Sequence, residues 1–259
     1  MPTTSTRPRT IATAFAVLGG CLALAVLAAD SGAAGTAAAK AHLLGKTAKT
    51  PRPTCPTPKD PNAPPEKACQ AMGRVTGFQT NADGRHNPFK VRAPGTIVAW
   101  RIDLSRPDKS EQKFFANALS KSGPPSARLA ILKPKGDGRY KLIRQSPVVQ
   151  LQSSLGSNQI FTLNAPLKVK KGMFVALTTS TWVSDLADFG ASAADSWRTS
   201  RDPGKCGTET TDSAAENEAD LKKLSRPQQK VGGARKYACE YKSARILYWA
   251  YFVPNRQGA

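Results

Sequence analysis

Short segments in which apolar and polar residues alternate, separated by turn residues, fill the middle of the chain. Residues 96–104 read TIVAWRIDL. Neighbouring side chains of an extended strand point to opposite faces, so Arg101 and Asp103 fall on one face. The other, apolar face is predicted to consist of Val98, Trp100, Ile102 and Leu104. This alternation of β-branched and aromatic residues with polar ones indicates a strand that is buried on one side.

The same pattern predicts further strands at 127–133, 140–145, 159–163, 167–169, 173–178 and 246–253. Residues 134–139, PKGDGR, predict a hairpin loop, and residues 170–172, KKG, predict a turn. The last strand is apolar on both faces, so we expect it in the middle of a sheet. Many short strands in a body of about 180 residues predict an all-β chain, folded as a jelly-roll-like antiparallel β-sandwich.

One or two short surface helices are expected between the strands. Residues 108–119 begin with Asp108 and Glu111, whose spacing suits a helix start. Residues 213–224 begin with a Ser-x-x-Glu capping box and are followed by Pro227, which ends a helix.

Residues 166–177 read PLKVKKGMFVAL. This strand–turn–strand resembles that of secreted bacterial jelly rolls, a group similar in outline to galactose-binding-like and other carbohydrate-binding sandwiches. The resemblance implies the sandwich fold. Members of that group often have an acid after the turn glycine, whereas this chain has Met173. No ligand residue is therefore carried over.

The first 29 residues have the order of an export signal, with Arg7 and Arg9 before an uncharged apolar run over 11–29. Signal peptidase would cut after Ala28 or, alternatively, after Ala39. The run is also long enough for an N-terminal membrane anchor. A third alternative is a lipobox ending at Cys21. All three alternatives place the rest of the chain in the extracellular space or the cell envelope.

Residues 30–69 are expected to form an Ala-rich and then Pro-rich linker, because seven of the fifteen residues at 51–65 are proline. The globular body is expected at 70–255. Four cysteines remain besides Cys21, an even number that suits disulfides in an exported chain. Three pairings are possible, and proximity in sequence favours Cys55 with Cys69 and Cys206 with Cys239. No C-x-x-C pair occurs, so we expect no metal site and no other cofactor.

The chain carries 38 Lys and Arg against 18 Asp and Glu, a net charge of +20. Such a field attracts polyanions. Outside a cell, the expected partners are polysaccharides or anionic wall polymers. Nucleic acid would be expected inside a cell, but no RNA-binding aromatic motif accompanies the charge. Membrane contact is expected only through an uncleaved N-terminal segment. Because the basic residues are scattered along the sequence, a merely solubilising surface remains an alternative.

Residue patterns typical of catalysis are few. His86 lies in a predicted loop, the chain has no G-x-S-x-G elbow, and this histidine is expected to be a surface residue. Asp185, Asp188 and Asp195 share one predicted loop, but their spacing matches no calcium-binding loop. We therefore favour a non-enzymatic function. A secreted hydrolase that uses loop carboxylates is the alternative.

The candidate binding site lies between two tryptophans. Flat rings with polar neighbours are suited to stacking on sugars, although large aromatic residues also close the ends of sandwiches. The predicted ligand-binding residues are Trp182, Trp197, Asp185, Asp188, Arg198 and Arg201. The sequence thus predicts an exported binding or envelope-associated module for carbohydrate or an anionic wall polymer. A purely structural surface protein is a further alternative.

Overall fold

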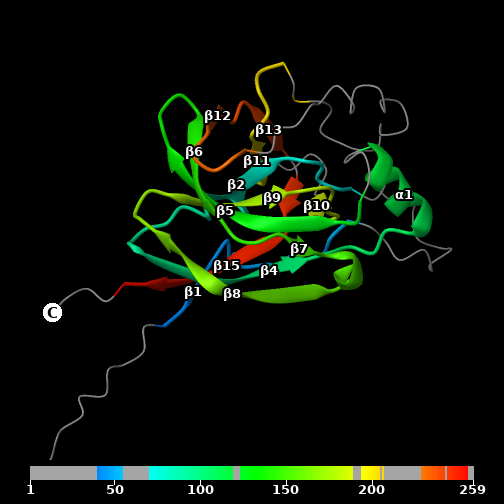
Figure 1. Ribbon diagram of the computed structural model, residues 1–259, viewed down its shortest axis with the longest axis horizontal. Helices are drawn as coiled ribbons and strands as arrows, with labels where there is room; N and C mark the ends of the chain where they lie inside the picture. Colours follow the sequence, from blue (N-terminus) through cyan, green and yellow to red (C-terminus); the bar gives the residue numbers. More distant parts are fainter. Residues whose placement is uncertain are drawn as a thin grey trace, which may run out of the picture. The chain divides into compact units, whose positions relative to one another are not determined.

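The computed structural model describes residues 40–54, 70–118, 123–188, 194–204, 206, 229–242 and 244–255. Their strands are antiparallel and form two large sheets and one small one, which confirms the predicted all-β class (Figure 1). The four-stranded sheet has the order β1 (His42–Leu44), β15 (Tyr248–Pro254), β4 (Gly95–Asp103), β8 (Asn158–Val169). The small sheet pairs β10 (Leu186–Asp188) with β14 (Ala244–Ile246).

The nine-stranded sheet contains seven strands along one path and two short side strands. Its path is β12 (Ala234–Lys236), β6 (Arg139–Gln145), β5 (Ser126–Pro134), β9 (Phe174–Thr179), β2 (Thr76–Ala82), β11 (Ser196–Thr199), β13 (Cys239–Lys242). β3 (Arg85–His86) pairs with β2, and β7 (Val149–Gln150) pairs with β5. A 3-10 turn, η1, spans Gln152–Ser154.

The main core lies between the two large sheets. Alternate residues of the facing strands enter it, including Trp100 of β4, Ile131 of β5 and Val175 of β9, each 0% exposed. The predicted inward face of residues 96–104 is correct from Trp100 onward. It is wrong at Val98, because the pairing of β4 with β8 shifts between Ile97 and Ala99 and Ile97 faces the core instead.

The turn at residues 170–172 forms as predicted, with Gly172 at φ 87°. It does not join a hairpin, however. β8 pairs with β4, whereas β9 pairs with β5 and β2, so the turn carries the chain from one sheet to the other. The loop at 134–139 is a true hairpin, because it joins β5 to its antiparallel neighbour β6.

The nine-stranded sheet curls until its two ends meet. β12 and β13 stand at opposite ends of the path, yet only Tyr237 and Ala238 separate them in the chain. The Tyr237 and Ala238 amides donate to the Gly138 and Arg201 carbonyls at 2.8 and 3.1 Å. The curl encloses a second apolar cluster on the side away from the main core, in which the Phe78 ring lies 5.7 Å from that of Tyr237.

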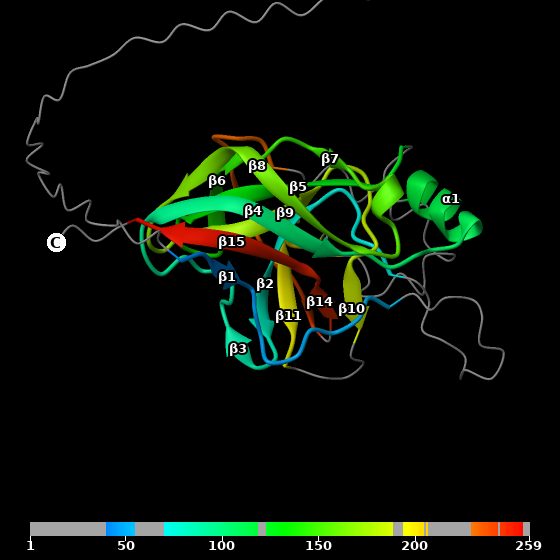
Figure 2. The same ribbon diagram turned by 90° about the horizontal axis from the view of Figure 1, so that it is seen from below.

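The chain N-terminal to the predicted body also contributes to the fold. We expected the body to begin at residue 70, but β1 pairs with β15 along the border of the four-stranded sheet (Figure 2). The buried Arg245 guanidinium donates to Thr47 Oγ1 at 2.7 Å and to the Gly45 carbonyl at 3.3 Å. Because β1 pairs with one side of β15 and β4 pairs with the other, β15 lies inside its sheet, as its apolar sequence predicts.

The first predicted helix is observed as α1 (Lys109–Ala118). Its start is capped reciprocally: the Glu111 amide donates to Asp108 Oδ1, and Glu111 Oε2 accepts from the Asp108 amide, each at 2.8 Å. The second predicted helix, at 213–224, lies outside the described residues, as does the apolar run at 11–29. Among the described residues, no helix is both long and apolar enough to cross a bilayer.

Candidate functional site

Both tryptophans proposed as sugar platforms are buried. Trp182 is 1% exposed, its ring lies 5.3 Å from the Phe115 ring of α1, and its indole N–H donates to the Gly123 carbonyl at 3.1 Å. Trp197 is 6% exposed and stacks on Tyr241 at 4.6 Å. A ring covered by protein offers no face to a sugar. Their burial favours the alternative in which they close the sandwich.

Asp185 is also enclosed. Its side chain is 0% exposed, and neither carboxyl oxygen has a hydrogen-bond partner within the described part of the chain. Burial raises the pKa of this carboxyl well above its ordinary value. Asp188 lies on β10 opposite Ala244, and its side chain is not among those described. The structure thus keeps Asp185 away from any ligand in solution.

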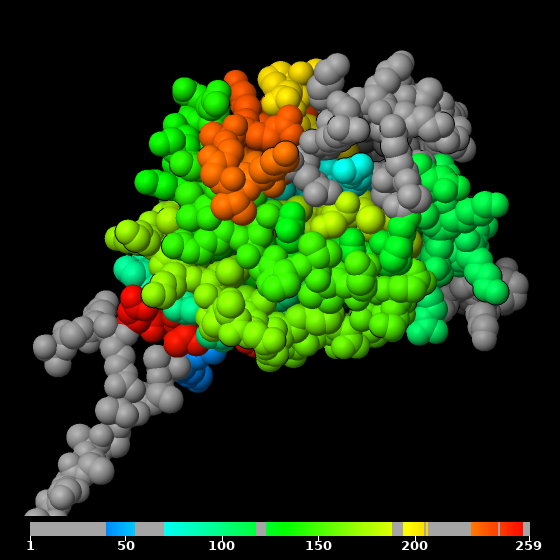
Figure 3. Space-filling model, viewed as in Figure 1, coloured from blue at the N-terminus to red at the C-terminus, as the bar shows by residue number. Residues whose placement is uncertain are grey.

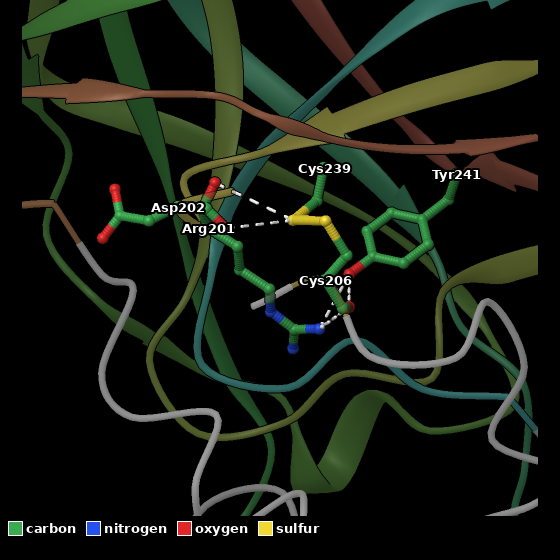
Figure 4. The surroundings of a disulfide bond; sticks show 5 residues. All are labelled: Arg201, Asp202, Cys206, Cys239 and Tyr241. Carbon is green, nitrogen blue, oxygen red and sulfur yellow. Dashed lines mark hydrogen bonds between the residues drawn. A yellow bond between two sulfur atoms is a disulfide. The ribbon is translucent and has the colours of Figure 1, made fainter. Parts of the chain in front are cut away.

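The arginines of the predicted site make contacts within the protein. Arg198 forms an ion pair with Glu240 at 2.8 Å. Burial raises the pKa of Glu240, but hydrogen bonds and the charge of Arg198 outweigh it and hold this pKa below its ordinary value. Arg201 Nη1 donates to the Cys206 carbonyl at 2.9 Å and to Tyr241 Oη at 2.8 Å (Figure 4). Both side chains therefore support the local fold.

One predicted disulfide is observed. Cys206 and Cys239 are bonded, and Tyr241 Oη also donates to the Cys206 carbonyl (Figure 4). Cys239 lies on β13 with no exposed surface, so the bond fixes residue 206 to the end of the curled sheet. Cys55 and Cys69 lie outside the described residues. A disulfide is typical of proteins from oxidising compartments.

The remaining polar candidates do not converge. His86 is exposed on the short strand β3, opposite Asn81 of β2. Asp195 is 5% exposed and accepts a hydrogen bond from the Asp83 amide at 3.2 Å. In the described ranges, no three His, Cys, Asp or Glu side chains are grouped so that they could hold a metal ion.

The structure brings together basic residues that are scattered along the sequence. Lys133 of β5 lies directly opposite Lys141 of β6, and Arg139 of β6 lies directly opposite Lys236 of β12. Directly opposed residues share a face of a sheet, and Arg139 and Lys141 are two residues apart on β6, so these four side chains lie on one face of the nine-stranded sheet as two neighbouring pairs. Figure 3 shows the β5–β6 hairpin, in green, beside the orange segment around β12.

A contact with the other large sheet adds Arg144 and Lys168 to this region. Arg144 Nη1 donates to the Lys168 carbonyl at 3.2 Å, which links β6 to β8 of the other sheet. We call the six residues Lys133, Arg139, Lys141, Arg144, Lys168 and Lys236 the basic edge. All are exposed except Lys141, which is partly buried.

Few acids offset the basic edge within the described part of the chain. Asp137 lies in the hairpin loop next to it, and Asp202 is already paired with Arg235 at 3.0 Å. One local signal for the basic edge was present in the sequence. Residues 133–141, KPKGDGRYK, contain four basic residues around a single acid, although only the register shows which of them share a face.

Comparisons of this chain with protein-family models, with curated proteins and with solved structures found no match. The resemblance of residues 166–177 to secreted jelly rolls therefore remains a prediction from the sequence.

Proposed function

We propose that this protein is an exported, non-enzymatic binding module for an anionic polymer of the cell envelope, and that the basic edge contacts the polymer. The observation that carries this proposal is the direct opposition of like charges, Lys133 with Lys141 and Arg139 with Lys236. Like charges that face each other across strands destabilise a sheet. A partner rich in phosphate or carboxylate groups would convert this repulsion into attraction.

The geometry suits a polymer better than a single small ligand. Neighbouring strands lie about 4.8 Å apart, so the two opposed pairs bring four cations close together across β5, β6 and β12. A chain with an anion on each repeat unit can meet several of these cations at once. The attraction acts over a Debye length of about 8 Å at physiological ionic strength, so binding should weaken as salt is added.

Export of the chain is part of this proposal. The basic start and apolar run of residues 1–29 support it, and so does the disulfide between Cys206 and Cys239. We do not adopt the hydrolase alternative, because one of its two carboxylates, Asp185, is enclosed. A preference for neutral sugars is likewise set aside, since it rested on the exposure of Trp182 and Trp197.

The proposal is tested by measuring binding to a poly(glycerol phosphate) wall polymer across a salt series. The double variant Lys133→Gln, Lys141→Gln should bind about 30-fold more weakly, because each lysine near an anionic surface contributes about 1 kcal/mol. The matched control is Lys109→Gln, Lys113→Gln on α1, which removes the same charge at two exposed positions. The control should change binding less than about threefold.

A second measurement separates lost contacts from a damaged fold. Removing one opposed pair relieves repulsion, so Lys133→Gln, Lys141→Gln should be as stable as the unmodified protein or slightly more stable, by up to about 1 kcal/mol. Equal loss of binding in both double variants would show only non-specific charge attraction and would refute a site at the basic edge.

A further inference from the structure

Two turns of the chain contain an Asp-Gly pair, Asp83–Gly84 between β2 and β3 and Asp137–Gly138 between β5 and β6. Both aspartates are exposed, and both have a positive φ, 52° at Asp83 and 48° at Asp137. Residues other than glycine are uncommon in this left-handed region. Because glycine has no side chain, it leaves its own amide nitrogen open to attack the carboxyl of the residue before it.

The two turns differ at the glycine amide. The Gly84 amide donates to the Ala194 carbonyl at 3.1 Å. The Gly138 amide, in contrast, has no hydrogen-bond partner among the described residues. A β-carbon placed on either glycine would meet no atom within 4 Å, so both turns are equally open. Only the nitrogen of Gly138 is therefore free to approach the preceding carboxyl without first breaking a bond.

We propose that Asp137–Gly138 is a site of spontaneous isoaspartate formation. The Gly138 nitrogen attacks Cγ of Asp137 and a C–N bond forms. The amide proton and the carboxyl hydroxyl leave as water, which closes a succinimide ring. Water then reopens the ring at the main-chain carbonyl of Asp137. The chain afterwards runs through Cγ, with one additional CH2 in its backbone and an unchanged mass, and no reactant other than water takes part.

The position of Gly138 gives this change a consequence for the fold. Across the turn, the Arg139 amide donates to the Gly136 carbonyl at 2.8 Å, and the Tyr237 amide donates to the Gly138 carbonyl, also at 2.8 Å. The second bond helps to join the two ends of the curled sheet. An additional CH2 between Gly136 and Arg139 lengthens the turn and disturbs the geometry of both bonds. Isomerisation therefore loosens the closure of the curl, whatever the basic edge binds.

The proposal is tested by incubating the full protein at physiological temperature and near-neutral pH, and by following isoaspartate through peptide mapping and labelling with an isoaspartyl methyltransferase. Asp83 is the matched internal control. Isoaspartate should accumulate at Asp137 at least about fivefold faster, because the reaction at Asp83 requires the Gly84 hydrogen bond to open first. Equal rates in the two turns, or no isoaspartate at Asp137, would overturn the proposal.

Variants separate the chemistry from its effect on the fold. Asp137→Gly removes the carboxyl and suits the positive φ, so it should abolish the modification in this turn. The melting temperature of the unmodified protein should fall during the incubation, and that of Asp137→Gly should not. An equal fall in both proteins would refute the effect on the curl.

A second pair of variants tests the role of the glycine amide. In Asp137→Asn and Asp83→Asn the same ring closes with loss of ammonia instead of water, and asparagine also tolerates a positive φ. Asp137→Asn should lose its amide at least about fivefold faster than Asp83→Asn. Loss at the same rate would show that the free amide of Gly138 does not set the reactivity.

Discussion

At the residue scale, Asp185 is a buried carboxyl whose enclosure costs free energy. A carboxyl with no exposed surface, whose oxygens find no hydrogen-bond partner among the described residues, favours its protonated, uncharged form. The ring of Tyr248 lies close enough that a charge on Asp185 would raise the pKa of its phenol, which burial already raises well above the ordinary value. This environment makes stability depend on pH.

Asp185→Asn is predicted to remove that dependence. The unfolded chain ionises this carboxyl at the ordinary pKa of 3.8, whereas the folded chain keeps the proton to a higher pH. The unfolded state therefore binds fewer protons between the two pKa values. The free energy of unfolding therefore falls as pH rises through this window, by up to about 1.4 kcal/mol per pH unit. Above the pKa of the folded state this loss stays constant. The asparagine has no such titration.

Urea unfolding from pH 4 to pH 8 checks this prediction. At pH 4 the free energy of unfolding should be similar in Asp185→Asn and in the unmodified protein. At pH 8 the variant should be the more stable. Parallel pH profiles for the two proteins would contradict the assignment of an unpaired, protonated Asp185.

The burial of Trp182 and Trp197 depends on residues far away in the sequence. Trp182 and Trp197 lie among polar residues in the sequence, a context shared by exposed binding rings and by rings that cap a core. The deciding contacts are distant in sequence, since Trp182 packs on Phe115 and Trp197 on Tyr241. Only the fold brings each tryptophan to its aromatic partner.

At the element scale, α1 docks on the body through the buried ring of Phe115. Phe115 is 2% exposed and packs on Trp182, together with Ala71 and Leu155. Phe115→Ala should lower the free energy of unfolding by about 3–5 kcal/mol, because it leaves a cavity between helix and sheet. Chemical denaturation measures this loss.

The adjacent Phe114→Ala is the control for Phe115→Ala. Phe114 is only partly buried, so its truncation should cost clearly less. Equal losses for the two variants would mean that helix propensity, rather than docking against Trp182, sets the effect.

Strands with a regular apolar alternation were predictable, whereas strands with polar interiors were not. β2 reads TGFQTNA and shows no alternation, yet it lies inside the nine-stranded sheet. Its Gln79 is 0% exposed, and its side chain hydrogen-bonds with backbone groups of β14. Nε2 donates to the Ala244 carbonyl at 3.1 Å, and Oε1 accepts from the Ile246 amide at 2.8 Å. A side chain that is buried through hydrogen bonds to distant backbone leaves no periodic signal.

At the scale of the whole molecule, the disulfide ties a loop to the end of the curled sheet. The cysteines are 33 residues apart, so in the chain-entropy model the bond destabilises the unfolded state by slightly under about 4 kcal/mol. Cys206→Ala with Cys239→Ala should lower the free energy of unfolding by about 3–4 kcal/mol.

Far-UV circular dichroism of this double variant should be unchanged at low temperature, because the sheet pairs of β11 and β13 do not need the bond. A loss below about 1 kcal/mol would mean that the unfolded state does not gain the expected freedom.

The sequence by itself determined the all-β class, most long strands, the α1 cap and the excess of positive charge, and it favoured the observed Cys206–Cys239 pairing among three. These properties depend on local periodicity, on short-range hydrogen bonds or on composition. The tertiary structure alone decided which sheet each strand joins and that the turn at 170–172 crosses between sheets. It also decided that Lys133, Lys141, Arg139 and Lys236 lie together on one face. It also buried Trp182, Trp197 and Asp185. Strand order and register join residues far apart in sequence, and their stability comes from a core that no local pattern describes.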